Sequence, residues 1–190
     1  MGGSGGVGST LHREGALELG TDPIPAGSYY QPAYFELERE AIFRRTWLQV
    51  GHMSELPEAG SYIVCEIDLC NASILITRGK DGGIRAFHNV STHRGTRLVT
   101  LGEGHAAAFT CRYHAWTFTH EGKLRAAPDF DRFYVDKAAC SLPRIAVDVC
   151  GQLIFVNLEP SPRQTLREFL GPLAEQLEKL PAATATHFSE

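Results

Sequence analysis

The sequence that decides the fold reads Phe87-His88-Asn89-Val90-Ser91-Thr92-His93-Arg94-Gly95 and, after a gap, Cys111-Arg112-Tyr113-His114-Ala115-Trp116. Seventeen residues separate His93 from Cys111, and two residues separate Cys111 from His114. Histidine and cysteine side chains are ligands of zinc and iron in proteins. Because two short loops at this spacing can leave neighbouring hairpins, the sequence predicts that they converge on one metal centre.

The spacing is that of a particular iron-sulfur site. In a Rieske centre two histidines bind one iron and two cysteines bind the other, and the required pattern is C-x-H-x17-C-x2-H. Here the pattern reads Ser91-x-His93, seventeen residues, then Cys111-x2-His114. His93, Cys111 and His114 are therefore the expected metal ligands, and Ser91 stands at the position of the fourth ligand.

Both segments resemble the cluster loops of Rieske non-heme iron ring-hydroxylating oxygenases, in the N-terminal Rieske domain of the large (alpha) subunit. The resemblance extends outward from Pro25 to Trp47, and on to residues 153–158 and 170–173. It implies a mainly β chain, an antiparallel Rieske iron-sulfur fold with flanking N- and C-terminal helices. It also implies a [2Fe-2S] cofactor and an oxidoreductase, a dioxygenase that hydroxylates aromatic rings.

The resemblance carries further expectations about partners. In that family the cluster accepts electrons from a ferredoxin or reductase and passes them to a mononuclear iron, held by two histidines and a carboxylate in a C-terminal domain. We expect this chain to lack that catalytic domain and its mononuclear iron, so no catalytic residue is assigned here. Electron transfer is then its function, and the chain alone is expected to be inactive in oxygenation. The full-length proteins usually form trimers.

Ser91 departs from the family pattern. A serine hydroxyl is a hard ligand with a far higher pKa than a thiol, so we expect an impaired cluster. Three explanations stay open: a deliberate substitution, a natural degenerate site, or a cluster held by the serine oxygen. Cys65 and Cys70 are weaker candidates for the fourth ligand, since neither has a metal-ligand spacing.

The remainder of the chain divides into four expected segments. Residues 1–20 form a Gly- and Ser-rich flexible leader, 21–60 an N-terminal helical segment, 61–160 the Rieske domain, and 161–190 the helical start of a connection to the missing catalytic domain. A helix is predicted over 32–45, and a capping box at Thr165 and Glu168 begins another that Gly171-Pro172 breaks. Strands are predicted at 62–67, 73–77, 84–90, 106–110, 115–119 and 152–158, with hairpin turns at 80–83 and 120–123.

Composition excludes several classes of function. Hydrophobic residues make up 43% and charged residues 21% of 190 residues, which is typical of a folded globular protein. A net charge of -4 provides no basic field for nucleic acid, and no apolar run approaches the ~20 residues that span a bilayer. We therefore expect neither nucleic acid nor membrane as a partner, and a cytoplasmic location. Five cysteines, an odd number, argue against a disulfide framework.

Two other kinds of protein fit the same motif. One is a stand-alone Rieske ferredoxin, against which the flanking helical segments argue. The other is a cluster-free or zinc-binding structural module, in which His93, Cys111 and His114 hold zinc with a water. Around the motif we expect Tyr113 and Trp116 to be core residues beneath the loops that shield the cluster. Arg94 either pins its loop or contacts a neighbouring subunit.

Overall fold

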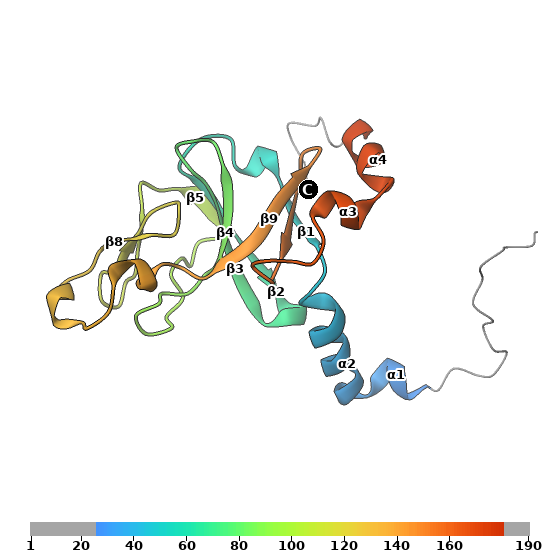
Figure 1. The fold of residues 1–190 in the computed structure, drawn as a ribbon, viewed down its shortest axis with the longest axis horizontal. Coiled ribbons are helices and arrows are strands. Elements are labelled where there is room, and N and C mark those ends of the chain that lie inside the picture. The colour runs from blue at the N-terminus through green and yellow to red at the C-terminus, as the bar shows by residue number, and fades with distance from the viewer. Residues whose placement is uncertain (1–25, 181–190) are drawn as a thin grey trace, which may run out of the picture.

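The computed structural model describes residues 26–180, and two antiparallel sheets dominate it (Figure 1). The larger sheet has seven strands in the order β1-β10-β9-β4-β3-β2-β5, and the smaller has three in the order β6-β7-β8. The small sheet lies at one end of the molecule and the four α-helices at the other. The strands are β1 (Leu48–His52), β2 (Ser61–Ile67), β3 (Ala72–Arg78), β4 (Ile84–His88), β5 (Glu103–His105), β6 (Phe109–Thr110), β7 (Thr117–Phe118), β8 (Leu124–Ala126), β9 (Arg144–Cys150) and β10 (Leu153–Asn157).

Strand β3 is the centre of the core because it is buried on both faces. Successive side chains of a strand point to opposite faces of a sheet. Ile74 and Ile76 accordingly join one hydrophobic cluster, and Leu75 between them joins a second. The second cluster also holds Phe118 and Cys111, so the small sheet and the metal-site motif pack on that face of the large sheet.

The predicted N-terminal helix is present, with one difference. The helix predicted over 32–45 comprises α2 (Pro32–Glu38) and a π-helical turn, Arg39–Phe43, that the sequence pattern did not indicate. A short helix that was not predicted, α1 (Gly27–Tyr30), precedes it. Arg39 donates through Nε to the Leu69 carbonyl at 2.7 Å, which ties this wider turn to the sheet domain. Within residues 26–180, none of the helices combines the length and the apolar character that crossing a bilayer demands.

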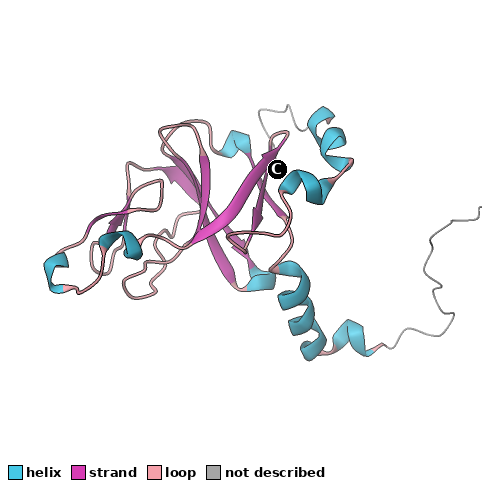
Figure 2. Cartoon of the chain, viewed as in Figure 1, coloured by secondary structure: helices cyan, strands magenta, loops and turns pink. Residues whose placement is uncertain are grey.

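The C-terminal helices form as the sequence indicated. Thr165 and Glu168 make the predicted capping box at the start of α3 (Leu166–Leu170). Gly171, with φ at +51°, ends this helix, and α4 (Leu173–Lys179) follows. Both helices pack beside β9 and β10 (Figure 2), where Leu166 and Ala174 are buried with Trp47 and Phe155.

The mainly β antiparallel architecture with flanking helices is thus confirmed. The two predicted hairpin turns also form: Gly79 N donates to Gly83 O, and Thr119 N donates to Lys123 O. Strands β1, β8 and β9 were not predicted, and the predicted strand 106–110 is replaced by β5 and β6 on either side of a break. The division into four segments stays a prediction; β1 joins the sheet from within the expected helical segment 21–60, and the leader 1–20 lies outside the described residues.

Candidate metal centre

The motif forms two loops with the same backbone closure. Loop 1 (residues 89–102) connects β4 to β5, and loop 2 (residues 111–116) connects β6 to β7. In each loop the first ligand position donates its N–H to the carbonyl five residues later and accepts from the N–H four residues later. The pairs are Ser91 N to Thr96 O (2.8 Å) and Gly95 N to Ser91 O (2.9 Å), and Cys111 N to Trp116 O (2.8 Å) and Ala115 N to Cys111 O (2.9 Å).

Positive φ angles make these tight turns possible. Gly95 has φ at +68°, and Ala115, at the matching place in loop 2, has φ at +55°. The left-handed region is open to glycine but costs an alanine about 1 kcal/mol. Ser91 therefore occupies the backbone position in loop 1 that Cys111 occupies in loop 2, although one has a hydroxyl and the other a thiol.

Unpaired buried atoms gather at this motif. Residues 26–180 contain five buried side-chain nitrogen or oxygen atoms without a hydrogen bond of ordinary geometry. Three of these atoms belong to the motif: Ser91 Oγ, which lies beside the Cys111 thiol, and the Nδ1 atoms of His93 and His114. The other two are His120 Nδ1 and Arg44 Nε, of which the second forms an ion pair with Glu40 at 3.1 Å. A buried polar atom without a partner is costly, and native proteins usually satisfy it. Two imidazole nitrogens and the buried Cys111 thiol are three of the four protein donors of a Rieske centre, so these residues fit this group, with Ser91 at the fourth position.

The two ligand histidines lie against each other and against aromatic side chains. The ring centroids of His93 and His114 are 4.5 Å apart, with an interplanar angle of 72°. Trp116 stacks on His93 at 4.6 Å and 11°, and Phe133 meets the edge of the same histidine at 5.6 Å. These contacts orient the His93 ring and cover one of its faces.

The predicted role of the two flanking aromatic residues is correct for one of them. Trp116 is 3% exposed and belongs to the core beneath the loops, as expected. Tyr113 is 64% exposed and lies over His114, with ring centroids 3.8 Å apart, so the prediction that it packs in the core was wrong. Within loop 2 only Cys111 and Trp116, which close it, are buried. Phe133, which covers His93, lies outside the motif and no spacing marked it.

Local electrostatics favour the metal-binding forms of two ligands. Burial alone raises the pKa of the Cys111 thiol, but hydrogen bonds from the Tyr113 backbone, the Ser91 side chain and the His114 backbone outweigh it, and the net pKa is lowered. Burial, then the nearby His114 and Arg94, lower the pKa of His93. Thiolate and neutral imidazole are the forms that coordinate metals.

A hollow of about 500 Å³ opens outside the two loops. His93 and His114 line its floor beside the aromatic rings of Tyr113, Trp116 and Phe133. The histidine side of the motif thus faces the surface, whereas Ser91 and Cys111 lie in the interior.

Other candidate ligands lie elsewhere. Cys70 is buried in the first hydrophobic cluster and Cys65 packs against it, whereas Cys111 belongs to the second cluster. Within residues 26–180, no three His, Cys, Asp or Glu side chains are placed to hold one metal ion. The alternative of a zinc site at His93, Cys111 and His114 stays a prediction that metal analysis tests. In a two-iron centre the histidines and the thiolates bind different irons, so such convergence is not required.

Comparison with known proteins agrees with the motif. The sequence profile of the Rieske [2Fe-2S] domain matches residues 46–149. The glycine betaine monooxygenase oxygenase subunit of Chromohalobacter salexigens is 37% identical over 158 residues, which cover 83% of this chain and 35% of that protein. The carnitine monooxygenase oxygenase subunit of Escherichia coli (strain K12) is 37% identical over 162 residues, which cover 83% of this chain and 42% of that protein.

Solved structures give the same picture. A crystal structure of the apo form of the quaternary ammonium Rieske monooxygenase CntA superposes with a TM-score of 0.76 at 36% identity, covering 81% of this chain and 44% of that one. Naphthalene 1,2-dioxygenase from Rhodococcus sp., bound to indole, superposes with a TM-score of 0.74 at 30% identity, covering 82% and 36%. The chain spans well under half the length of these relatives.

Proposed function

This chain belongs to the Rieske [2Fe-2S] domain family, and from that premise we propose that it is an electron-transfer domain whose cluster site is formed by Ser91, His93, Cys111 and His114. The observation that carries the proposal is the pair of buried Nδ1 atoms of His93 and His114 without a hydrogen-bond partner, beside the buried Cys111 thiol and the Ser91 hydroxyl that contacts it. When bound, a Rieske cluster supplies a one-electron redox centre.

Each residue has a definite task in this proposal. His93 and His114 would bind one iron through Nδ1. Cys111 would bind the other iron, and Ser91 stands at the position of that iron's second protein ligand. Trp116 and Phe133 hold the His93 ring in place, and Trp116 covers one of its faces. Because the histidines line the surface hollow, electrons would enter and leave on that side.

For the whole protein we propose an oxygenase subunit, as its relatives are named. A ferredoxin or reductase would donate electrons, and a mononuclear iron in a further domain would receive them. The relatives are named for glycine betaine, carnitine and naphthalene. Two substrate classes are therefore candidates, quaternary ammonium compounds and aromatic hydrocarbons, and aromatic ring hydroxylation applies to the second. Residues 26–180 would carry electrons without oxygenating a substrate themselves.

The test of the cluster site is selective loss of iron. After reconstitution with iron and sulfide, the chain with Ser91 should bind iron with acid-labile sulfide below the full two-iron content, because Ser91 is a poor ligand. Cys111→Ala should lose this iron, and Cys65→Ala should keep it, since Cys65 packs against the other hydrophobic cluster. Metal analysis and EPR of the reduced protein give the readout. Equal iron in both variants, or one zinc per chain, would overturn the proposal.

A further inference from the structure

Loop 1 is closed by a buried amide. Asn89, 3% exposed, is the first residue after β4, ahead of Ser91 and His93. Its Nδ2 donates to Val99 O at 2.8 Å, and its Oδ1 accepts from Val99 N at 2.9 Å. One side chain thus replaces a pair of backbone hydrogen bonds between the two ends of the turn that carries both loop 1 ligand positions.

A relay of side chains connects this amide to the sheet. Asn89 Nδ2 also donates to Ser73 Oγ at 3.1 Å, and Asn89 N donates to Ser73 O at 2.8 Å. Ser73 Oγ donates to Glu66 Oε1 at 2.7 Å, and Arg97 of loop 1 donates to both oxygens of Glu66, at 2.8 and 3.1 Å. The relay begins on β2, crosses β3 and returns to loop 1.

The residues of this relay contribute unequally to the stability of loop 1. Arg97 and Glu66 are about half exposed, and exposed ion pairs contribute little to stability. Asn89 is buried and its amide is satisfied at both ends, so removing it leaves Val99 N and Val99 O without partners. Loop 2 has a weaker equivalent at its base, a single hydroxyl contact of 3.0 Å between Thr110 and the part-exposed Thr117.

We propose that Asn89 is the positioning residue of the cluster site. It holds loop 1 on the sheet so that Ser91 and His93 face Cys111 and His114 before any cluster binds. The inference rests on the proposed function for its spectroscopic consequence, whereas its effect on the loop itself does not require a metal.

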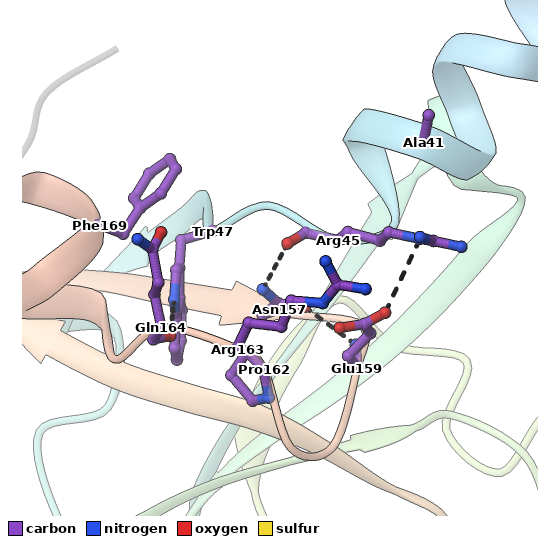
Figure 3. A pocket seen from close by; sticks show the side chains of 9 residues that line it. All are labelled: Ala41, Arg45, Trp47, Asn157, Glu159, Pro162, Arg163, Gln164 and Phe169. Atoms are coloured by element: carbon purple, nitrogen blue, oxygen red, sulfur yellow. Dashed lines mark hydrogen bonds and ion pairs between the residues drawn. The ribbon is translucent and has the colours of Figure 1, made fainter.

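A second buried asparagine provides a matched control. Asn157, 1% exposed, donates through Nδ2 to Arg45 O at 3.0 Å and accepts from Glu159 N at 3.0 Å (Figure 3). It makes the same kind of bridge beside a cavity of about 340 Å³ lined by Arg45, Trp47 and Phe169, with none of the cluster residues among its lining. Asn157→Ala therefore loses two side-chain hydrogen bonds of a buried amide away from the site, against three in Asn89→Ala, so each variant's exchange is compared with its own change in global stability.

The experiment measures amide hydrogen exchange in the metal-free, unsubstituted chain and in both variants. In Asn89→Ala, exchange at the hydrogen-bonded amides of Ser91 and Gly95 should accelerate about tenfold or more beyond any change in global unfolding. In Asn157→Ala these amides should change only as global stability does. Ser73→Ala, which removes one link of the relay, should act in the same direction with a smaller effect and serves if Asn89→Ala does not fold.

The second readout is the EPR spectrum and iron retention in the Ser91→Cys background. Adding Asn89→Ala should shift or broaden the reduced-state signal and speed iron loss, whereas adding Asn157→Ala should leave the signal unchanged. Loop 1 exchange that rises equally in both variants would overturn the inference, as would identical spectra. A Ser91→Cys background without cluster would count against the proposed function alone, because the exchange experiment is independent of metal.

Discussion

Replacing Ser91 with cysteine should convert a chain that binds iron poorly into one that holds about two irons and two sulfides. The two loops have the same backbone closure, so the new thiol would stand where Cys111 stands in loop 2. Ser91 is fully buried and its hydroxyl lies beside the Cys111 thiol, so a thiol in its place would face Cys111 across the site. A thiolate forms near neutral pH when it binds a metal, whereas a serine hydroxyl must lose a far less acidic proton.

The measurement compares Ser91→Cys with the unsubstituted chain after reconstitution. Reducing conditions keep the introduced thiol and Cys111 from forming a disulfide. Iron and sulfide counts, visible absorption and reduced-state EPR report the centre, and the melting temperature should rise because the cluster cross-links both loops. Thr92→Cys is the control: it adds a thiol one residue away, where the exposed Thr92 side chain bonds Cys140 O. If the unsubstituted chain already holds a full two-iron centre of equal stability, Ser91 does not impair cluster binding.

The metal-site motif could be predicted from sequence because its information is local. The spacing of His93, Cys111 and His114 fixes their place in two short loops, and the glycine at position 95 permits the tight turn of loop 1. The residues that support the two loops could not be predicted from local spacing. Phe133 comes from a distant segment, and Asn89 looks like any polar residue after a strand until its contacts with Val99 are visible.

The strands that the sequence pattern missed share a physical reason. Strand β9 carries the exposed Asp148 between Val147 and Val149, so its apolar residues form no continuous run. It pairs with β10 in a local hairpin on one side, and its place beside β4 on the other side is a long-range contact. Tertiary pairing of this kind overrides local propensity. The π-helical turn at 39–43 likewise has no local signal, since its register is fixed by the bond from Arg39 to Leu69.

The hairpin turn at Gly122 should be the least tolerant position of the small sheet. Gly122 has φ at +77°, and its carbonyl accepts from Leu142 N at 2.8 Å. A Cβ at this residue would overlap the ring of Phe87, which is buried at the end of β4 just before loop 1. The same turn joins β7, which follows loop 2, to β8. Strain at Gly122 would therefore reach the supports of both ligand loops.

Gly122→Ala should lower the free energy of unfolding by about 3 kcal/mol, of which about 1 comes from the left-handed backbone and the rest from overpacking against Phe87. Gly82→Ala isolates the first contribution, because Gly82 has φ at +76° and open space where the Cβ would lie, so about 1 kcal/mol is expected there. Urea denaturation of both variants measures the two values. The larger loss arises only if Phe87 cannot move, and it cannot move without displacing the core that also buries Cys111 and Trp116. Equal losses of unfolding free energy in the two variants would mean that Phe87 and the core around it rearrange at little free-energy cost. The ligand loops would then pack on a more deformable core than their contacts indicate.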